Sequence, residues 1–462
     1  MRFKYKHQTI KFLHLLETVF FMKNFKRILL LAVIALAITI YYNYPKLNIL
    51  AGYSAKNTAS SVFLAGRSLE FTDANDNNFS PINVTSDEIN VEEKSATGSV
   101  YGLLKRKAVY REGLGAVLVT DDFDITKPQL TPKRSKPDNT TPFPYGNADH
   151  KDTIFANIDY TKLNETIDTI FNDRNQTRSV IVVYKNKIIA EKYDTGFTKE
   201  SKQLGWSMTK SITGTLFGIL KCQGKVDVQE NNLFSEWEND NRKNITIHNL
   251  LQMNSGLEWE EDYNTISDVT KMLFLEKDMT KTQVRKPLIG KPNETWNYSS
   301  GTSNVLSGIL RTKFDTHQEY LDFWYTGLID KIGMNSMIVE TDMSNHFVGS
   351  SYAWATARDW AKLGLLYLHN GEWNGEHLFD KDWVTYATTP TPTSDGWYGA
   401  QIWLNAGGRY PDAPKNMFSF NGYKGQNVFI LPSQNLVVVR TGLTKNADVN
   451  TLLKGIINSI KN

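Results

Sequence analysis

The sequence predicts an α+β domain in which an antiparallel sheet is built from both ends of the domain and packs with helices and a helix-rich insert region. Two predicted β-hairpins support this fold class, residues 179–196 and residues 427–442, which lie far apart in the chain. Residues 225 to about 345, between them, are rich in helices and loops. Strands at both ends with helices between them suit a sheet covered by helices.

The composition predicts a folded chain with a large core. It argues against functions that depend on a high net charge or on several cysteines. The chain has 462 residues, of which 40% are hydrophobic and 12% aromatic. A formal net charge of +3 is small for this length, so nothing indicates a nucleic-acid-binding surface. Cys222 is the single cysteine, and the eight histidines show no ligand spacing. We therefore expect no disulfide within the chain, no metal centre and no cofactor.

The N-terminus predicts a membrane segment. Residues 1–27 form a basic N-terminal segment with a single acid, Glu17, and residues 28–44 follow without a charge. A basic flank before an apolar run is typical of signal sequences and membrane anchors. It predicts that the part of the chain after the run is exported. The run is marginal for a span of about 20 residues. Tyrosines near its end favour an uncleaved anchor over a cleaved signal or a buried soluble helix, and Met22 is an alternative start.

Residues 45–150 are expected to form an N-terminal extension that ends in a linker. Its first part contains alternating stretches that suit short strands, but no chemistry stands out there. Residues 126–147 hold five of the 14 prolines, which is the composition of an extended linker. A lid or docking piece is one interpretation of this extension.

Residues 151–462 have the pattern of a globular domain. The first hairpin turns at Lys185-Asn186, and the second turns around residues 432–435. Residues 353–370 have a helical apolar period that ends at an Asn-Gly stop signal. Residues 447–460 predict a closing amphipathic helix.

The stretch "GWSMTKSITGTLFGIL", residues 205–220, predicts a buried helix with a reactive first turn. Ser207 and Lys210 are three residues apart and therefore share one face of a helix. An apolar helix would desolvate the lysine, lower its pKa and free its amine to act as a base for the serine. The alternative is an N-cap serine beside a solvated lysine. The second glycine of a G-x-S-x-G elbow is absent, and nothing indicates a Ser-His-Asp triad.

Two later segments strengthen the catalytic interpretation. Tyr298, in "WNYSSGTSN", follows a proline-containing loop and precedes a predicted helix, where its hydroxyl can face a cleft. "FNGYKGQNVFI" places Gly422 and Gly425 at the start of a predicted strand, where glycines let another chain or a ligand approach closely. A packed aromatic residue and a β-bulge are the alternative interpretations of these two segments.

Taken in order, these motifs resemble the β-lactamase and penicillin-binding-protein superfamily of serine hydrolases, with its β-lactamase/transpeptidase-like fold. The chain is most similar to the class C-like branch, which includes β-lactamase-fold esterases, D-aminopeptidases and 6-aminohexanoate-dimer hydrolases. "LLQMNSGL" at 250–257, "ATARDWAKLGLLYLHNGEW" at 355–373 and the closing hairpin support this resemblance. It covers about residues 153–460.

The resemblance implies a role for each matching residue. Ser207 would be the nucleophile, Lys210 its base partner and Tyr298 the second proton-transfer group. The backbone N–H groups of Ser207 and Gln426 would form the oxyanion hole, at about 3 to 4 kcal/mol per donor. The residues expected to contact the substrate are Ser300, Tyr423, Lys424 and Gly425.

Two departures from the family pattern favour an esterase or amidase over a β-lactamase. Ser300 stands where β-lactamases have the asparagine of Tyr-x-Asn, and it lacks an amide. The cation of Lys-Thr-Gly is displaced by one position when the chain is aligned on Gly425, which turns Lys424 to the opposite face of a strand. A cell-wall D,D-peptidase or D-aminopeptidase, a β-lactamase-type enzyme and a catalytically silent binding protein are the alternatives.

The expected partners are a small-molecule or peptide-like substrate and a membrane contacted through residues 28–44. No nucleic acid is expected. The sequence leaves the identity of the substrate and the oligomeric state open.

Overall fold

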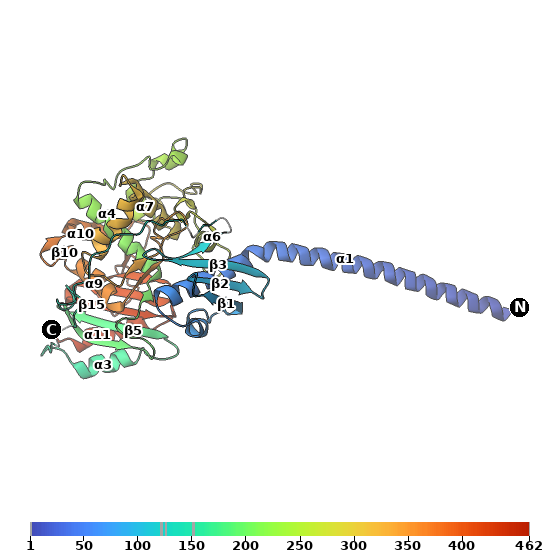
Figure 1. Cartoon of the computed structure of the whole chain (residues 1–462), viewed down its shortest axis with the longest axis horizontal. Coiled ribbons are helices and arrows are strands. Elements are labelled where there is room, and N and C mark those ends of the chain that lie inside the picture. The colour runs from blue at the N-terminus through green and yellow to red at the C-terminus, as the bar shows by residue number, and fades with distance from the viewer. Residues whose placement is uncertain (1, 121–122, 125–126, 150–152, 462) are drawn as a thin grey trace.

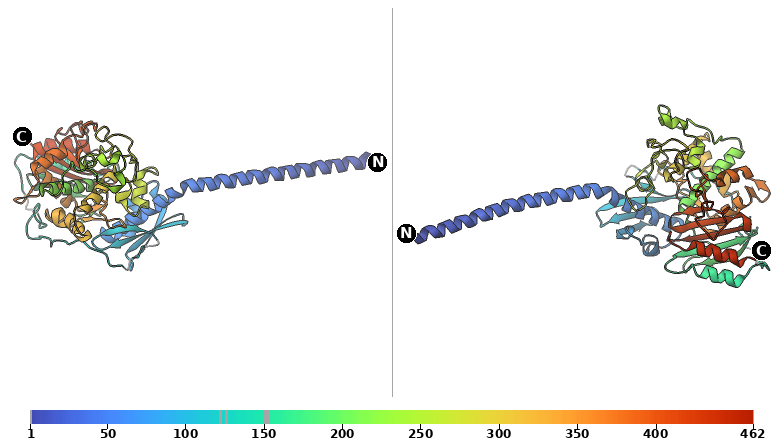
Figure 2. Two further views of the ribbon diagram at one scale, coloured as in Figure 1. Left: turned by 90° about the horizontal axis from the view of Figure 1, so that it is seen from above. Right: turned by 180° about the vertical axis from the view of Figure 1, so that it is seen from behind.

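The computed structural model describes residues 2–120, 123–124, 127–149 and 153–461. A single long helix, α1 (Arg2–Ala59), projects from a folded body that holds the rest of the described chain (Figure 1). The C-terminus lies on the side of the body away from the projecting end of α1, as the turned views also show (Figure 2).

Helix α1 joins the apolar N-terminal segment to the body without a break. Within the described residues it is the one helix long and apolar enough to cross a membrane, by length and composition, over Phe20–Leu64. The side chains of the predicted span at 28–44 are exposed to solvent, whereas most of those from Ile49 to Ala59 are buried in the body. The helix therefore continues through Pro45, at the loss of one main-chain hydrogen bond, because its last turns pack in the body.

The N-terminal extension forms its own layer. Its short strands are an antiparallel sheet in the order β1-β2-β3-β4, and α1 packs across β2 and β3. Small side chains make this close packing feasible, and Gly98 is one example, since a Cβ there would lie 2.5 Å from the Ala51 carbonyl oxygen. The strands are β1 (Thr85–Asn90), β2 (Ser95–Val100), β3 (Leu104–Arg111) and β4 (Gly115–Val119).

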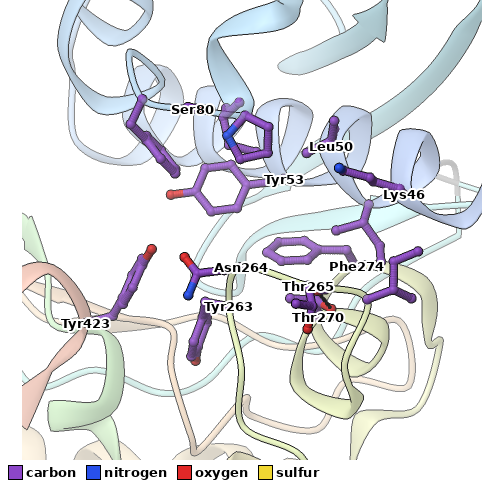
Figure 3. Close-up of a pocket in the computed structure, with 15 residues that line it drawn as sticks. Lys46, Leu50, Tyr53, Ser80, Tyr263, Asn264, Thr265, Thr270, Phe274 and Tyr423 are labelled. Carbon is purple, nitrogen blue, oxygen red and sulfur yellow. Dashed lines mark hydrogen bonds between the residues drawn. The ribbon is translucent and has the colours of Figure 1, made fainter. Parts of the chain in front are cut away.

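The same stretch of α1 also contacts the loop and helix at α6 (Asp268–Leu275) of the body. Figure 3 shows Tyr53 and Leu50 of α1 facing Tyr263, Asn264 and Phe274 across this junction. The extension is therefore part of the folded body. Helix α1 supplies one wall of the space between the extension and the segment that carries Tyr263 and Phe274.

The main sheet confirms the predicted fold class. Its order is β12-β13-β14-β15-β5-β6, antiparallel throughout, so that the strands of the last hairpin pair with those of the first. The first hairpin turns at Lys185 and Asn186, both with positive φ, as the Asn-containing two-residue turn predicts. The strands are β5 (Thr177–Tyr184), β6 (Lys187–Tyr193), β12 (Trp403–Leu404), β13 (Phe418–Gly422), β14 (Gln426–Leu431) and β15 (Leu436–Gly442).

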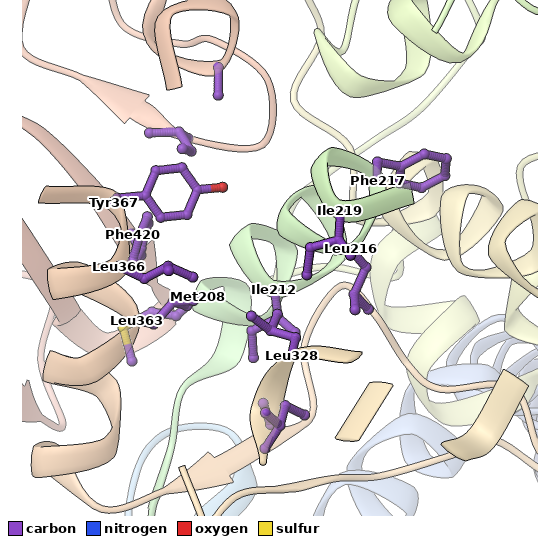
Figure 4. Packing of buried hydrophobic residues seen from close by; sticks show 14 of the residues in the cluster. Met208, Ile212, Leu216, Phe217, Ile219, Leu328, Leu363, Leu366, Tyr367 and Phe420 are labelled. Atoms are coloured by element: carbon purple, nitrogen blue, oxygen red, sulfur yellow. The ribbon is translucent and has the colours of Figure 1, made fainter. Parts of the chain in front are cut away.

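Helices cover both faces of this sheet. Alternate residues of β5 face opposite sides: Ile181 and Val183 pack in the larger core with α4 (Thr209–Cys222) and α9 (Ala357–Leu368). Val180 and Val182 pack in a second core with α3 (Tyr160–Asp168) and α11 (Val449–Ser459). Figure 4 shows the α4 side chains between those of α9 and Leu328. Helix α4 is therefore central to the core and fixes the position of its first turn.

The smaller elements complete the body. The predicted helix at 353–370 begins later than expected, because its first residues form β9, which pairs with β7 and β8. The remaining helices are α2 (Leu69–Phe71), α5 (Ile247–Leu251), α7 (Ser300–Thr312), α8 (His317–Phe323) and α10 (Lys381–Thr388). The short strands are β7 (Gln203–Leu204), β8 (Ile338–Val339), β9 (Ala353–Ala355), β10 (Glu372–Trp373) and β11 (Glu376–His377).

Candidate active site

The turn before α4 holds Ser207 in a constrained position. Residues Trp206–Met208 form a 3-10 turn, and Trp206 has a left-handed backbone with φ of 47°. Such strain in a non-glycine residue persists only where the surroundings fix it, and it is concentrated at functional sites. A Cβ at Gly205 would lie 2.2 Å from the Trp360 ring, so glycine is required by the close packing of this turn. Ser207 retains 9% exposure at the start of the buried helix.

Lys210 is a buried amine directed at this serine. Its Nζ lies 3.0 Å from the Ser207 Oγ, 2.9 Å from the Ser300 Oγ and 3.0 Å from the Ser350 carbonyl oxygen. Burial lowers the pKa of Lys210 to about 8, and the carboxylate of Glu261 partly opposes this shift. The neutral amine is therefore accessible near neutral pH, and it is the form that can accept the serine proton.

Tyr298 completes the predicted trio. It lies in the loop that leads into α7, where the Ser299 side chain caps the helix by accepting from the Thr302 N–H at 2.9 Å. The Lys210 Nζ lies 4.9 Å from the centroid of the Tyr298 ring, and the Tyr298 hydroxyl interacts with the Ser207 side chain. Burial raises the pKa of Tyr298 above its usual value, so the phenol is protonated at neutral pH. The structure thus brings Ser207, Lys210 and Tyr298 together.

Ser300 links this group to a carboxylate that the sequence analysis missed. The Ser300 Oγ donates to the Glu261 Oε1 at 2.5 Å. The other Glu261 oxygen accepts from the Ser300 N–H at 2.8 Å and from the Trp259 Nε1 at 2.6 Å. The acid-rich stretch "WEEDY" after the "LLQMNSGL" motif was the only available signal, because nothing in the spacing distinguishes Glu261 from its acidic neighbours. Ser300 thus contacts the Lys210 amine and the Glu261 carboxylate.

The strand beside the nucleophile differs from the predicted one. The Gly422 Cα packs against the Gly205 carbonyl, to which a Cβ would come within 2.1 Å, so the end of β13 approaches the nucleophile turn. Gly425 instead belongs to the turn that follows, with φ of 78°, and packs against Thr444 and Arg440 of the opposite side. Gln426 begins β14, the next strand of the sheet. The close approach to the nucleophile turn is therefore made by Gly422 and not, as predicted, by Gly425, whereas the donor role of the Gln426 N–H stays a prediction.

Lys424 was predicted to contact the substrate, but its amine is directed toward the N-terminal extension. Its Nζ lies 3.4 Å from the centroid of the Phe79 ring and donates to the Asp76 carbonyl oxygen at 3.4 Å. Burial lowers the pKa of Lys424 to about 7. Both partners belong to the N-terminal extension. Lys424 therefore joins the extension to the hairpin.

Tyr423 lies among aromatic residues at the edge of the site. Its ring stacks on that of Tyr263, with centroids 4.6 Å apart and an interplanar angle of 14°. It also meets the Trp206 ring edge to face at 5.4 Å. Tyr423 therefore contacts the residue that precedes Ser207 in the chain, and its contact with the substrate stays a prediction.

One group of side chains has the composition of a metal site. Ligand atoms of Asp278, Asp342 and His346 lie within 4.8 Å of one another. The Asp342 oxygens already accept from the backbone N–H groups of Met279, Ser344 and His346. Because these bonds account for the carboxylate without an ion, we assign no metal to the group.

The chain is similar to known proteins over more than half of its length. The family model described as Beta-lactamase matches residues 167–448, more than half of the chain. The 6-aminohexanoate-dimer hydrolase of Paenarthrobacter ureafaciens is 22% identical over 294 residues, which cover 57% of this chain and 72% of that protein.

Solved structures share the fold at low identity. A Bacillus anthracis protein named as a 6-aminohexanoate-dimer hydrolase has a TM-score of 0.55 at 21% identity and covers 64% of this chain and 80% of its own. A family VIII carboxylesterase has a TM-score of 0.53 at 13% identity, with 65% and 97% covered. A penicillin-binding protein homologue from Caulobacter crescentus has a TM-score of 0.51 at 13% identity, with 65% and 97% covered.

Proposed function

Because the chain belongs to the beta-lactamase family of serine hydrolases, we propose that it cleaves an ester or amide bond through an acyl-enzyme on Ser207, as an exported, membrane-anchored enzyme. The observation that carries the proposal is the contact of the Lys210 amine with the Ser207 hydroxyl at 3.0 Å inside the core. A buried lysine without a salt bridge is unfavourable for stability. Its role in activating the nucleophile explains why it is found there.

Acylation would proceed by transfer of the serine proton. The neutral Lys210 amine takes the proton of the Ser207 Oγ as this oxygen forms a bond to the substrate carbonyl carbon. The carbonyl becomes a tetrahedral oxyanion, which backbone N–H groups stabilise. The Ser207 N–H is one donor, and the approach of Gly422 to the nucleophile turn supports the Tyr423 N–H as the second.

Collapse of this intermediate would release the first product. The bond between the carbonyl carbon and the leaving oxygen or nitrogen breaks, and Tyr298 gives its proton to that atom. Tyr298 then recovers a proton from the Lys210 ammonium, whose Nζ lies beside its ring. Water attacks the ester of Ser207 with loss of a proton to the same groups, which releases the acid and restores the serine.

Two features support membrane anchoring and export. By the positive-inside rule, the basic residues before the apolar run favour a cytoplasmic N-terminus. Helix α1 continues from this run into the body, so a cut just after the run would fall inside a helix. Both features favour an uncleaved anchor with the body on the exported side.

Covalent labelling tests the proposed chemistry. A fluorophosphonate reagent is expected to label the wild-type chain, whereas Ser207→Ala should show no labelling and Lys210→Ala a rate at least a hundredfold lower, because general-base catalysis contributes about 10²–10⁴. Labelled penicillin is expected not to react. Penicillin labelling at Ser207 would favour the β-lactamase or D,D-peptidase alternatives, and absence of labelling by both reagents would contradict the enzymatic proposal.

A further inference from the structure

We infer that a cavity between α1 and the body binds the alkyl chain of a membrane-borne substrate, attached to the acyl side of the scissile bond. This inference rests on the proposed function, since it names the substrate class of the same site. The cavity has a volume of about 320 Å³, within the range of small-molecule sites. Its apolar wall is made by Ile49, Leu50, Phe79, Ile82, Ile266 and Phe274.

The cavity lies between two parts of the chain, and the family model matches one of them. Ile49, Leu50 and Phe79 belong to the N-terminal extension, which lies outside the region matched by the family model, and Ile266 and Phe274 belong to the matched region. Figure 3 shows α1 above the cavity and the segment carrying Tyr263, Asn264 and Thr265 below it. The extension therefore adds an apolar site to a hydrolase fold.

Tyr263 and Tyr423 connect this cavity to the catalytic group. Both rings line the cavity. The Tyr263 hydroxyl is buried, and burial and the charge of Glu261 raise the pKa of this phenol. The Tyr423 ring meets Trp206, the residue before the nucleophile. The stacked Tyr263 and Tyr423 rings thus lie between the cavity and the nucleophile turn, and an acyl chain bonded to Ser207 would pass along them to enter the cavity.

The acyl side of the substrate is the side that fits the cavity. In the proposed mechanism Tyr298 protonates the leaving group, which places that group beside Tyr298. The aromatic partners of Tyr298 are Trp296, Tyr398 and Trp403, and none of these three lines the cavity. The acyl chain therefore extends the other way, past Tyr263 and Tyr423.

The position of the cavity along α1 favours a membrane source for this chain. The cavity lining on α1 begins at Lys46 and reaches Tyr53, so it lies about 3 to 14 Å along the helix from the end of the predicted span at Tyr44. Lys46, at the cavity edge on the span side, suits a position at lipid headgroups. An apolar chain leaving the bilayer would cross little water to enter the site.

A chain-length series on the full protein in lipid nanodiscs tests the cavity. Two phosphonofluoridates with the same leaving group, one ethyl and one decyl, are compared by their rates of Ser207 labelling. Burial of each methylene is worth up to about fourfold, so the decyl reagent should react at least about tenfold faster with the wild type. Ile266→Trp, which fills the cavity wall, should lower the decyl-to-ethyl ratio at least about fivefold. Ile289→Trp, at an isoleucine that is 70% exposed, should keep the ratio.

Equal rates for both reagents in the wild type, or the same ratio in Ile266→Trp, would overturn the cavity assignment. The decyl reagent is also loaded either into the discs that carry the protein or into protein-free vesicles. We expect faster labelling when the reagent is loaded into the discs that carry the protein. Equal rates from the two sources would overturn the inference that the substrate enters from the membrane.

A binding measurement separates this inference from the proposed function. If neither reagent labels Ser207, the proposed function fails, and the cavity is judged from the fluorescence of dansyl-undecanoate bound to the same discs. Weaker binding by Ile266→Trp than by Ile289→Trp is expected. Equal binding by the two variants would overturn the cavity assignment.

Discussion

At the residue scale, the site depends on a lysine that is buried without a salt-bridge partner of its own. The three oxygens around the Lys210 Nζ belong to two hydroxyls and a carbonyl, all neutral groups. They accept hydrogen bonds without supplying the negative charge that would favour the ammonium. Desolvation therefore dominates, and Glu261 opposes it only through Ser300 and across space.

The pH dependence of the reaction should report this lysine. Since burial lowers the pKa of Lys210 to about 8, the neutral base is depleted as the pH falls below that value. We expect kcat/KM for an ester substrate to fall about tenfold per pH unit below an acid limb near pH 8. A pH-rate profile of the wild type checks this, and an acid limb below pH 6 would contradict the assignment of Lys210 as the base.

Glu261 should set the position of that limb. Its negative charge raises the pKa of Lys210 against the effect of burial, so Glu261→Gln is expected to move the acid limb to lower pH. Glutamine has one acceptor oxygen where the carboxylate has two, so it cannot accept from the Ser300 hydroxyl and from the Ser300 and Trp259 N–H groups on separate oxygens, and kcat should also fall. Glu260→Gln, at the exposed neighbouring position, serves as the matched control and should leave the profile unchanged. A limb that stays in place in Glu261→Gln would show that this carboxylate does not act on the lysine.

The residues that the sequence could predict are those with a local signature. Ser207 and Lys210 share a helix face by their spacing, and Tyr298 precedes a helix start that can be recognised. Glu261 carries no such signal, because its role comes from a hydrogen bond to a residue far along the chain. Burial and partners of this kind exist only in the folded chain.

At the element scale, the nucleophile turn depends on close packing against α9. The Gly205 φ is −76°, which any residue adopts, so the glycine is needed for space rather than for backbone freedom. Trp360 of α9 occupies the place of its missing side chain. The strained Trp206 backbone follows directly, and the position of Ser207 therefore depends on this contact.

Gly205→Ala is expected to disturb this turn. The added methyl group would overlap the Trp360 ring, which should cost about 1–3 kcal/mol of unfolding free energy and lower the rate of fluorophosphonate labelling. Gly290→Ala is the control, since a Cβ there has open space around it. Thermal unfolding and labelling of the two variants give the comparison. Unchanged labelling in Gly205→Ala would show that the turn tolerates the shift.

The predicted hairpins were confirmed because turn chemistry is local. Lys185-Asn186 and the turn ending at Asn435, with φ of 51°, both carry residues that adopt left-handed backbone. The prediction that Gly425 approaches the nucleophile turn was wrong. Both Gly422 and Gly425 permit a close approach, and the sequence does not distinguish them. The structure decides through their neighbours, which are Gly205 for one and Arg440 and Thr444 for the other.

At the scale of the whole molecule, a buried carboxylate joins the N-terminal extension to the catalytic domain. Glu340 accepts from the Lys56 Nζ at 2.5 Å and the Ser60 Oγ at 2.8 Å, both in the first part of the chain. It also accepts from the Ala116 N–H of β4 at 2.8 Å and from the Trp354 Nε1 at 2.9 Å. One side chain thus binds α1, β4 and the domain that carries the active site.

Glu340→Gln should loosen the extension. The change leaves the buried Lys56 ammonium without its counter-charge, which typically costs about 3–5 kcal/mol. We expect a lower unfolding temperature and faster proteolysis within residues 60–120. Glu93→Gln removes the exposed partner of Lys107 in the same layer and should have little effect. Equal behaviour of the two variants would show that the extension does not depend on Glu340.

The place of the extension could not be predicted from the sequence. The short strands could be predicted from their alternating pattern, but their docking depends on single long-range contacts such as those of Glu340. Contacts between residues hundreds of positions apart leave no pattern in either segment. The interface with the catalytic domain, and the cavity in it, follow only from the structure.

In the proposed anchored enzyme, the unbroken course of α1 through Pro45 sets the orientation of the body relative to the membrane-spanning turns. A helix turns by about 100° and rises by 1.5 Å per residue, so the direction in which the cavity faces is set by residue count. Two alanines inserted between Tyr44 and Pro45 should turn it by about 200° and slow labelling by a decyl reagent in the same nanodisc. Four alanines should return it to within about 40° at a height about 6 Å greater, with labelling largely restored. Loss in both variants would identify height rather than phase as the determinant.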